Sequence, residues 1–397
     1  MVERILIVGF GTMGSGIAEV FAMNGFEVNV YDAYRDVIPR SLEGIRWSLG
    51  KLREKGSLRE DVDTVMKRIH VFDNLGNAAR DVDLVIEAVF EDPKVKHQVY
   101  RELEGYVGKD VIIASNTSGI PITYLQSVLQ YKGRFAGFHW FNPPVLMRLV
   151  EVIKGRDTSD ETAGALMDLA RRVGKEPILV RRDVRGFIAN RVFGVLSTQA
   201  FILYMRGIYD YRAMDSALIY RLGLPMGVFA LTDFTGGIKL SYESRNLFEE
   251  IDRVAPETEP SKGLAKARTF VFSLIEKMYR EGRIGIRTGK GFYEYPEPGR
   301  WVRPDIPREL ADKVNLLDLL APMVNESLRM ERLGICTRGD IDKALKLGYN
   351  WPKGLFEIYG RDFTATDVVN TLRRMSDLIP DLREFYEPDP ALLNETK

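Results

Sequence analysis

The sequence has little cysteine or histidine and no excess of either charge. Cys336 is the single cysteine of the chain, so no internal disulfide can form, and one thiol is typical of a reducing compartment. Three histidines and one cysteine also argue against a zinc site. Lys plus Arg and Asp plus Glu each number 56. This balance predicts no nucleic-acid partner and no anionic membrane surface.

Long apolar runs are missing as well. No run approaches the ~18–20 residues that a membrane-spanning helix needs, and Arg4–Val8 reads as a strand rather than as part of a signal peptide. We therefore expect a soluble, cytoplasmic protein. With 397 residues, 45% apolar and 28% charged, the composition is that of a globular chain with two or three domains.

A glycine-rich segment near the amino terminus separates an apolar strand from a helix. The strand Ile5–Val8 runs into the sequence GFGTMGSG at residues 9–16. In a dinucleotide-binding turn, Gly9 would allow the tight turn, Gly11 would let a pyrophosphate approach the backbone, and Gly14 would let the helix pack on the strand. The helix amino terminus would then meet the phosphates with its amide groups. The alternative is that these glycines serve only the turn.

An acid at the end of the next strand strengthens this interpretation. The strand Glu27–Tyr31 ends on Asp32, which follows Gly11 at the spacing expected of a ribose-binding acid. Asp32 would accept hydrogen bonds from the ribose hydroxyls and repel a 2′-phosphate, which favours NAD. Nearby Arg35 is the one feature that would favour NADP instead.

The strand-helix alternation continues to residue 180 and predicts a doubly wound, mostly parallel sheet. Further strands are expected at residues 69–72, 83–88, 110–114, 134–139, 148–153 and 177–180, with helices at 37–54, 60–68 and 93–106. Ligands bind at the carboxyl ends of such strands. Polar clusters at Asp32, Glu87–Glu91, Ser115–Ser118 and His139 all fall at that edge.

His139 ends an apolar strand that a double proline stops at residues 143–144, and twelve residues later Glu151 interrupts another apolar strand. A carboxylate there is costly to bury without a partner. Imidazole is the natural partner, and a carboxylate-oriented histidine is a common general base. A histidine that merely packs under a loop is the alternative.

Seven segments resemble the 3-hydroxyacyl-CoA dehydrogenase family and occur in the same order as in that family. They are GFGTMGSG, IEAVFEDPKVK, ASNTSGIPIT, FAGFHWFNPPVLMRLVEVIKG, RGFIANR, LGLPMGVFALTDFTG and RTGKGFYEY, between residues 9 and 295. The resemblance implies reversible oxidation of (S)-3-hydroxyacyl-CoA by NAD, for example 3-hydroxybutyryl-CoA to acetoacetyl-CoA.

The resemblance also assigns roles to individual residues. It implies that His139 is the catalytic base, that Glu151 orients this base, and that Ser118 and Asn190 contact the substrate. The implied cofactor contacts are Gly9, Gly11, Thr12, Met13, Gly14, Ser15, Gly16, Asp32, Glu91, Lys96, Ser118, Asn142 and Arg287. The implied CoA contacts are Ser48, Lys55 and Ser118. Arg287 stands where the family usually has lysine, and Trp140 stands where it usually has phenylalanine, so Trp140 could alter the pocket.

The carboxyl-terminal half contains a repeat. Gly207-Ile208, Asp215, Ala217-Leu218, Pro225, Gly227 and Phe229 recur 127 residues later, for example as Asp342, Gly354 and Phe356. A fixed offset predicts a duplicated helical domain. We expect an NAD-binding domain at residues 1–183, one helical copy at 184–296 and a second at 297–397. Asn190 projects onto Leu317, so the second copy is expected to be catalytically silent.

Other functions and partners stay open. A free hydroxy acid or a sugar acid is an alternative substrate, and an NAD-binding scaffold subunit is the non-enzymatic alternative. Paired helical copies could form an internal pseudo-dimer within a monomer, or the chain could form a homodimer. The resemblance further implies a possible association with an enoyl-CoA hydratase, whose domain this sequence does not contain. We expect no bound metal.

Overall fold

The computed structural model describes residues 2–396, and the chain divides between Phe187 and Ile188 into two compact units. The first contains one large sheet with helices, and the second is helical. No helix in residues 2–396 is both long and apolar enough to cross a bilayer.

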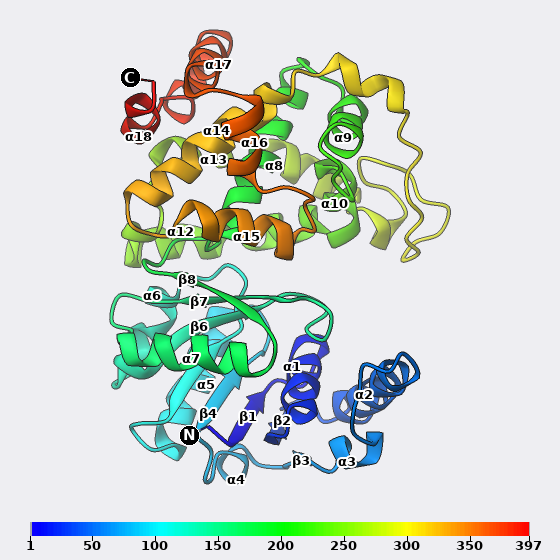
Figure 1. Ribbon diagram of the computed structural model, residues 1–397, viewed down its shortest axis with the longest axis vertical. Coiled ribbons are helices and arrows are strands. Elements are labelled where there is room, and N and C mark those ends of the chain that lie inside the picture. The colour runs from blue at the N-terminus through cyan, green and yellow to red at the C-terminus, as the bar shows by residue number, and fades with distance from the viewer. Residues whose placement is uncertain (1, 397) are drawn as a thin grey trace. The chain divides into compact units, whose positions relative to one another are not determined.

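The sheet has eight strands in the order β3-β2-β1-β4-β5-β6-β7-β8 (Figure 1). The strands are β1 (Arg4–Val8), β2 (Glu27–Tyr31), β3 (Ile69–Val71), β4 (Leu84–Glu87), β5 (Ile112–Ser115), β6 (Phe135–Trp140), β7 (Leu149–Ile153) and β8 (Glu176–Val180). Strands β1 to β6 are parallel. Strand β7 pairs antiparallel with β6, and β8 pairs parallel with β7. The prediction of a mostly parallel sheet is therefore confirmed.

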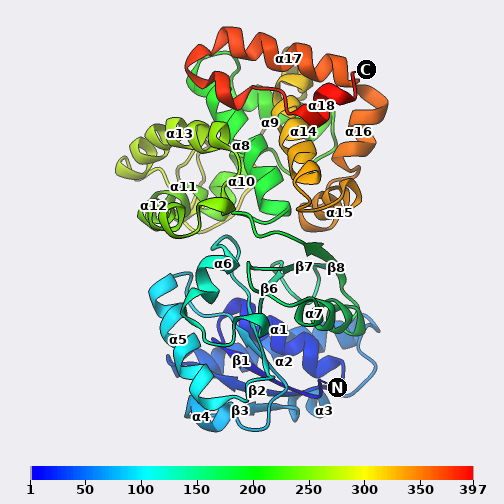
Figure 2. The ribbon, with the colours of Figure 1, turned by 90° about the vertical axis from the view of Figure 1, so that its left-hand side faces the viewer.

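Helices cover both faces of the sheet. They are α1 (Thr12–Met23), α2 (Val37–Glu54), α3 (Val62–Met66), α4 (Leu75–Ala78), α5 (Pro93–Tyr106), α6 (Ile122–Leu125) and α7 (Asp160–Arg172). Figure 2 shows α5 and α7 on opposite sides of the strands. The predicted helices at 37–54 and 93–106 are confirmed with the same bounds, whereas the segment predicted at 60–68 forms only the short α3.

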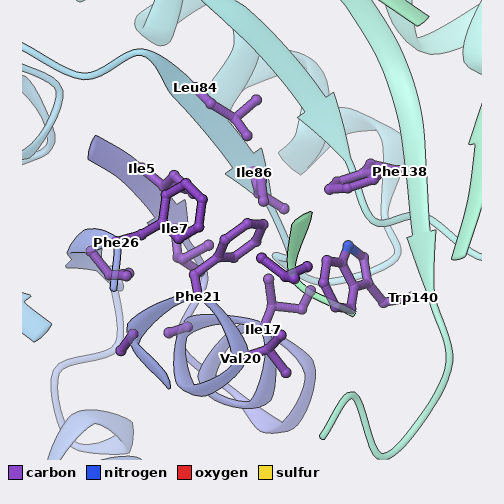
Figure 3. Packing of buried hydrophobic residues seen from close by; sticks show 14 of the residues in the cluster. Ile5, Ile7, Ile17, Val20, Phe21, Phe26, Leu84, Ile86, Phe138 and Trp140 are labelled. Carbon is purple, nitrogen blue, oxygen red and sulfur yellow. The ribbon is translucent and has the colours of Figure 1, made fainter. Parts of the chain in front are cut away.

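The apolar pattern of the strands explains why both faces are covered. Side chains alternate between the two faces of a strand, and all of residues 5–8 on β1 are buried. Ile5 and Ile7 pack into a cluster with α1, where Phe21 contacts Trp140 edge to face at 5.7 Å between ring centroids (Figure 3). A strand that is apolar on both faces is typical of a parallel sheet between two helical layers.

The second unit consists of eleven α-helices in the described residues, with α8 and α14 packed against each other. They are α8 (Ala189–Met205), α9 (Tyr211–Tyr220), α10 (Val228–Thr235), α11 (Gly237–Glu243), α12 (Arg245–Val254), α13 (Lys262–Arg280), α14 (Leu316–Arg332), α15 (Arg338–Gly348), α16 (Leu355–Asp362), α17 (Ala365–Leu378) and α18 (Pro390–Asn394). The bounds of α14 and α16 lie 127 residues after those of α8 and α10.

The first helix of this unit, α8, starts at Ala189, two residues after Phe187. Gly186 and Phe187 have φ angles of 81° and 55°. Positive φ angles are incompatible with a right-handed helix. The helix therefore begins only after these two residues.

Candidate active site

His139 and Glu151 form a buried pair on neighbouring strands. They face each other directly in the register of β6 and β7, and Nδ1 of His139 lies 2.8 Å from Oε2 of Glu151. The residues are 5% and 0% exposed. A carboxylate at Nδ1 favours the tautomer whose proton is on that nitrogen, because the carboxylate can only accept. Nε2 is then the ring atom that can accept a proton.

Aromatic side chains enclose the imidazole. The ring of Phe141 lies 4.5 Å from that of His139, and the ring of Phe187 lies 5.7 Å away, measured between centroids. Phe187 is fully buried although its φ angle is positive, a conformation that costs about 1–3 kcal/mol in a non-glycine residue. The contact between the Phe187 and His139 rings is one interaction that offsets this strain.

Trp140 belongs to the core rather than to the pocket. Successive residues of a strand point to opposite faces, so Trp140 points away from its neighbour His139 and packs against Phe21 and Phe138. It is 2% exposed. No contact of Trp140 therefore supports our expectation that it could alter the pocket.

The Lys175 ammonium lies 5.5 Å from the centroid of the tryptophan ring, and burial lowers the pKa of Lys175 to about 8.

A charged network underlies the loop after β5. Oε1 of Glu87 accepts from the Lys96 ammonium at 2.7 Å, and Oε2 accepts from Tyr100 at 2.5 Å and from Ser115 at 2.8 Å. Both Glu87 and Lys96 are buried. Although burial opposes its charge, Glu87 and Glu91 together raise the pKa of Lys96. The family resemblance implied that Lys96 contacts the cofactor. In this structure its ammonium forms ion pairs with Glu87 and Glu91.

Glu91 connects this network to Ser118. Its Oε1 accepts from the Thr117 hydroxyl at 2.6 Å and from the backbone amide of Ser118 at 2.9 Å, while Lys96 lies 3.2 Å from Oε2. Desolvation would favour the neutral acid, but the Lys96 charge and the hydrogen bonds from Thr117 and Ser118 hold the pKa of Glu91 below its ordinary value. An ionised Glu91 therefore fixes the backbone of Ser118.

Three glycines in the loop at residues 9–16 differ in what a side chain at each position would contact. A Cβ on Gly9, whose φ angle is +94°, would lie 2.6 Å from the carbonyl of Ala88, and a Cβ on Gly14 would lie 1.8 Å from the oxygen of Gly9. A Cβ on Gly11 would meet nothing within 4 Å. The protein itself therefore does not require glycine at position 11. A ligand that occupied this open space would require glycine at this position.

The end of α1 that follows this loop suits an anion. The helix has neither a side-chain cap nor an acidic residue in its first turn, so its first amide groups remain available for a phosphate. The remaining predicted contacts of the loop, Thr12, Met13, Ser15 and Gly16, form the first turns of α1. These features fit a dinucleotide pyrophosphate.

Asp32 supports the loop from the end of β2. Its Oδ2 accepts from the Phe10 amide at 2.6 Å, and its Oδ1 accepts from the Tyr34 amide at 2.8 Å. Arg35, the residue that could have favoured a 2′-phosphate, pairs with Asp73 at 2.5 Å on the surface. The carboxylate at position 32 is thus fixed at the edge of the loop, as a ribose-binding acid would be.

A cavity of about 690 Å³ joins the two groups of ligand contacts predicted in the first unit. Its wall includes Gly11 and Asn142 from the predicted cofactor site, and Ser48 and Lys55 from the predicted CoA site. Two cations that the sequence analysis did not single out, Arg40 and Lys51, also line it. Their positions on α2, at multiples of about one helical turn from Ser48 and Lys55, are the signal that could have revealed them.

Glu19 is a further acid in the wall of this cavity, and the sequence analysis missed it. It lies on α1, is 3% exposed, and its Oε1 has no hydrogen-bond partner. Burial raises the pKa of Glu19 to about 7, against a smaller opposing effect of a hydrogen bond from Ser48. A single acid in the apolar stretch from Ile17 to Ala22 was the available signal.

Two predicted residues lie in the second unit. Asn190 is in the first turn of α8, and its Oδ1 accepts from the Tyr349 hydroxyl at 2.7 Å. Arg287 lies in a single 3-10 turn beside Gly236. His139 belongs to the first unit, so the roles of Asn190 and Arg287 stay predictions.

Comparison with known proteins assigns most of the chain to one family. Residues 4–184 match the 3-hydroxyacyl-CoA dehydrogenase NAD binding domain, and residues 186–295 and 318–392 match the C-terminal domain of the same family.

Individual relatives agree with this match. A probable 3-hydroxybutyryl-CoA dehydrogenase from Deinococcus radiodurans is 37% identical over 73% of this chain and 99% of its own. A 5-formyl-3-hydroxy-2-methylpyridine 4-carboxylate 5-dehydrogenase from Mesorhizobium japonicum is 32% identical over 80% of this chain and 99% of its own. In fold, the chain is similar to the crystal structure of 3-hydroxybutyryl-CoA dehydrogenase from Escherichia coli, with a TM-score of 0.82, 24% identity and coverage of 100% and 99%. The chain belongs to the 3-hydroxyacyl-CoA dehydrogenase family, and its amino-terminal unit contains the NAD-binding domain of that family.

Proposed function

We propose that this protein is an oxidoreductase that reversibly oxidises (S)-3-hydroxyacyl-CoA to 3-oxoacyl-CoA, with NAD as cofactor and His139 as general base. The observation that carries this proposal is the buried pair of His139 and Glu151, 2.8 Å apart at the sheet. Family membership supports the same reaction. A bound NAD would accept the hydride that the alcohol carbon loses.

Proton transfer falls to His139. Oxidation of a secondary alcohol requires removal of the hydroxyl proton as the hydride leaves, and Nε2 of His139 can take this proton. The imidazolium that forms is then stabilised by Glu151, which holds the other ring nitrogen. In the reverse direction, the protonated ring donates to the ketone oxygen. Burial strengthens this charge pairing because water does not screen it.

The substrate oxygen needs further hydrogen-bond donors, and we assign them to Ser118 and Asn190. The support for Ser118 is its backbone anchor to Glu91, which holds this residue in the loop that follows β5. The support for Asn190 is its identity within the family segment RGFIANR at residues 185–191. We assign the CoA portion to Ser48 and Lys55, because the cavity that they line also contains the cations Arg40 and Lys51, which suit the phosphate groups of CoA.

The test is steady-state oxidation of NADH with acetoacetyl-CoA and with free acetoacetate, and the same assay with NADPH. We expect turnover of the thioester with NADH and a much higher kcat/KM than for the free acid. A His139→Ala variant should lose this activity. Equal rates with both substrates would contradict the CoA assignment, and an unchanged His139→Ala variant would contradict the whole mechanism.

A free acid remains the second candidate substrate. The observation that favours it is a relative with 32% identity whose name specifies a pyridine carboxylate rather than a CoA ester. The same pair of assays separates the two candidates. An NAD-binding scaffold, the non-enzymatic alternative, would bind NADH but show no turnover with either substrate.

We further propose that the helical unit is a tandem duplication, with copies at residues 184–296 and 297–397. Both the structure and the sequence support this proposal. Asp215 accepts from the Phe229 amide at 3.0 Å, and Asp342 accepts from the Phe356 amide at 2.8 Å, with all partners offset by 127 residues.

One active site per chain follows from this proposal, because Leu317 replaces Asn190 in the second copy. Two helical copies in one chain could also pack against each other as the helical domains of two subunits would in a dimer. We therefore propose that the protein is a monomer. Sedimentation equilibrium would test this, and a dimer mass would contradict it. A homodimer, or association with an enoyl-CoA hydratase, would appear in the same experiment as a higher mass.

A further inference from the structure

The ammonium of Lys175 binds the connection between β6 and β7, residues 141–148. Lys175 immediately precedes β8, whose first residue pairs with the first residue of β7. The ammonium donates to the carbonyl oxygen of Met147 at 2.8 Å and also to that of Pro144. Lys175 is 8% exposed, so both bonds form largely away from water. All of these residues belong to the first unit.

The sequence of the connection explains why a donor from elsewhere is needed. Pro143 and Pro144 have no amide proton to donate, and the amides of Leu146 and Met147 both donate to the Pro143 carbonyl at 3.0 Å. The Pro144 and Met147 carbonyls accept from Lys175 instead. Pro144 is itself buried, and a buried carbonyl that lacks a donor is costly. The lysine therefore stabilises this conformation of the connection.

The charge of Lys175 has no acidic partner. No carboxylate in residues 2–396 pairs with its ammonium, which contacts the two carbonyls and lies 5.5 Å from the centroid of the Trp140 ring. An apolar side chain would fill the same space without the cost of burying a charge. It could not, however, donate to two carbonyls. The ammonium is therefore suited to fixing the connection rather than to filling space.

Helix α1 contacts the same connection at Gly16. A Cβ on Gly16 would lie 2.8 Å from Cδ and 2.9 Å from Cγ of Pro144. The proline ring therefore packs directly on the backbone of α1, and a side chain at position 16 would displace it. Pro144 is thus held by α1 through its ring and by Lys175 through its carbonyl.

The part of the connection that is held in this way forms a wall of the large cavity. Residues 142–146 line that cavity together with α1 and α2, and so do Ser48 and Lys55, which we assigned to the CoA portion of the substrate. We propose that Lys175 is a positioning residue for CoA, which holds this wall in place without lining the cavity itself. The inference rests on the proposed function, in which CoA occupies the cavity.

Lys175→Met keeps an unbranched side chain and removes both donors. A hydrogen bond from a charged group corresponds to a factor of about 10 to 150 in an equilibrium constant. We therefore expect the KM for acetoacetyl-CoA to rise about tenfold or more at saturating NADH, with kcat changed less than about twofold, because Lys175 contacts neither His139 nor Glu151. Acetoacetyl-N-acetylcysteamine, a thioester without the nucleotide and most of the pantetheine arm, should keep its kcat/KM.

Two further variants support the comparison. Gly16→Ala displaces the Pro144 ring from the opposite side and should raise the KM for acetoacetyl-CoA with the same selectivity. Lys154→Met is the matched control, because its ammonium pairs with Asp160 and it does not line the cavity. Its kinetic constants should equal those of the parent protein. If Lys175→Met does not fold, Lys175→Gln, which keeps a donor on a shorter side chain, replaces it, and a smaller selective rise in KM is expected.

The outcomes separate the inference from the proposed function. A parent protein that turns over neither thioester contradicts the proposed function itself. With an active parent, an unchanged KM for acetoacetyl-CoA in the Lys175 variant or in Gly16→Ala overturns the inference. Equal losses with both thioesters also overturn it, because Lys175 would then act on the chemistry rather than on CoA. A lower melting temperature with an unchanged KM would assign Lys175 to stability alone and would likewise overturn it.

Discussion

Nδ1 of His139 and Oε2 of Glu151 lie 2.8 Å apart across an antiparallel strand pair, with both side chains inside the protein. The contributions of the two residues can be separated by substitution at each. We expect His139→Ala to lower kcat by about 10²- to 10⁴-fold, the usual contribution of a general base. Glu151→Gln should lower it less, because an amide still orients the ring but no longer stabilises its charge.

The measurement is single-turnover kinetics of NADH oxidation, and melting temperatures check that both variants are folded. A Glu151→Gln variant that keeps the activity of the parent protein would show that the charge of Glu151 does not contribute to catalysis.

Gly11→Ser tests the ligand at the open position of the loop. Serine is at least as good a helix N-cap as glycine, and no atom lies within 4 Å of the added Cβ, so stability should not change. The KM for NAD should rise by tenfold or more, because the side chain occupies the space proposed for the pyrophosphate. Gly50→Ala on α2, where a Cβ also meets nothing, is the control and should leave this KM unchanged.

Glu19 should make stability depend on pH. Its pKa is raised from 4.5 to about 7 by burial, so the folded state binds the proton more tightly than the unfolded state. Its contribution to stability is therefore fully present below about pH 4.5 and is lost as the pH rises to about 7. Glu19→Gln has no charge to bury, and we expect it to melt at a higher temperature than the parent at pH 8 but not at pH 4.5.

Differential scanning calorimetry at the two pH values measures this difference. Glu102→Gln, a substitution at an exposed acid of α5, is the control. A Glu19→Gln variant with the same shift at both pH values would contradict the assignment.

Arg191→Met should destabilise the helical unit. The substitution removes the fully buried cation between Glu259 and Glu326, and breaking a buried pair costs about 3–5 kcal/mol. Each glutamate keeps a second arginine, Arg268 or Arg329, so we expect the lower end of that range in urea unfolding. Arg280→Met removes an exposed pair with Glu276 on α13 and should cost at most about 0.5 kcal/mol. Equal losses for the two variants would contradict this view of the buried cluster.

The strands and most helices of the first unit could be predicted from sequence because their signals are local. Apolar runs of four to six residues, turn residues between them and the glycine pattern at residues 9–16 all act over short distances. The reversed direction of β7 was also accessible in principle. Its connection to β6, residues 141–148, is shorter than the dozen or more residues that a parallel crossover needs.

Contacts between distant segments could not be predicted. From the sequence we placed Glu87 in a polar cluster and Lys96 at the cofactor, but no pattern indicated the buried bond that joins this strand to the next helix. The bond between Asn190 and Tyr349 joins residues 159 apart, and no local pattern specifies it. Such pairs depend on how helices pack, which the sequence sets only through the sum of many side-chain contacts.

The hairpin of β6 and β7 has one more consequence. Because the two strands are joined directly, the proposed base and its partner are specified by one short continuous segment, residues 135–153. Bringing them together costs little chain entropy, since the loop between them is short. Changes elsewhere in the chain need not alter the sequence of this segment. Evolution could therefore vary which acyl group is recognised while the proposed proton-transfer pair is inherited as a single segment.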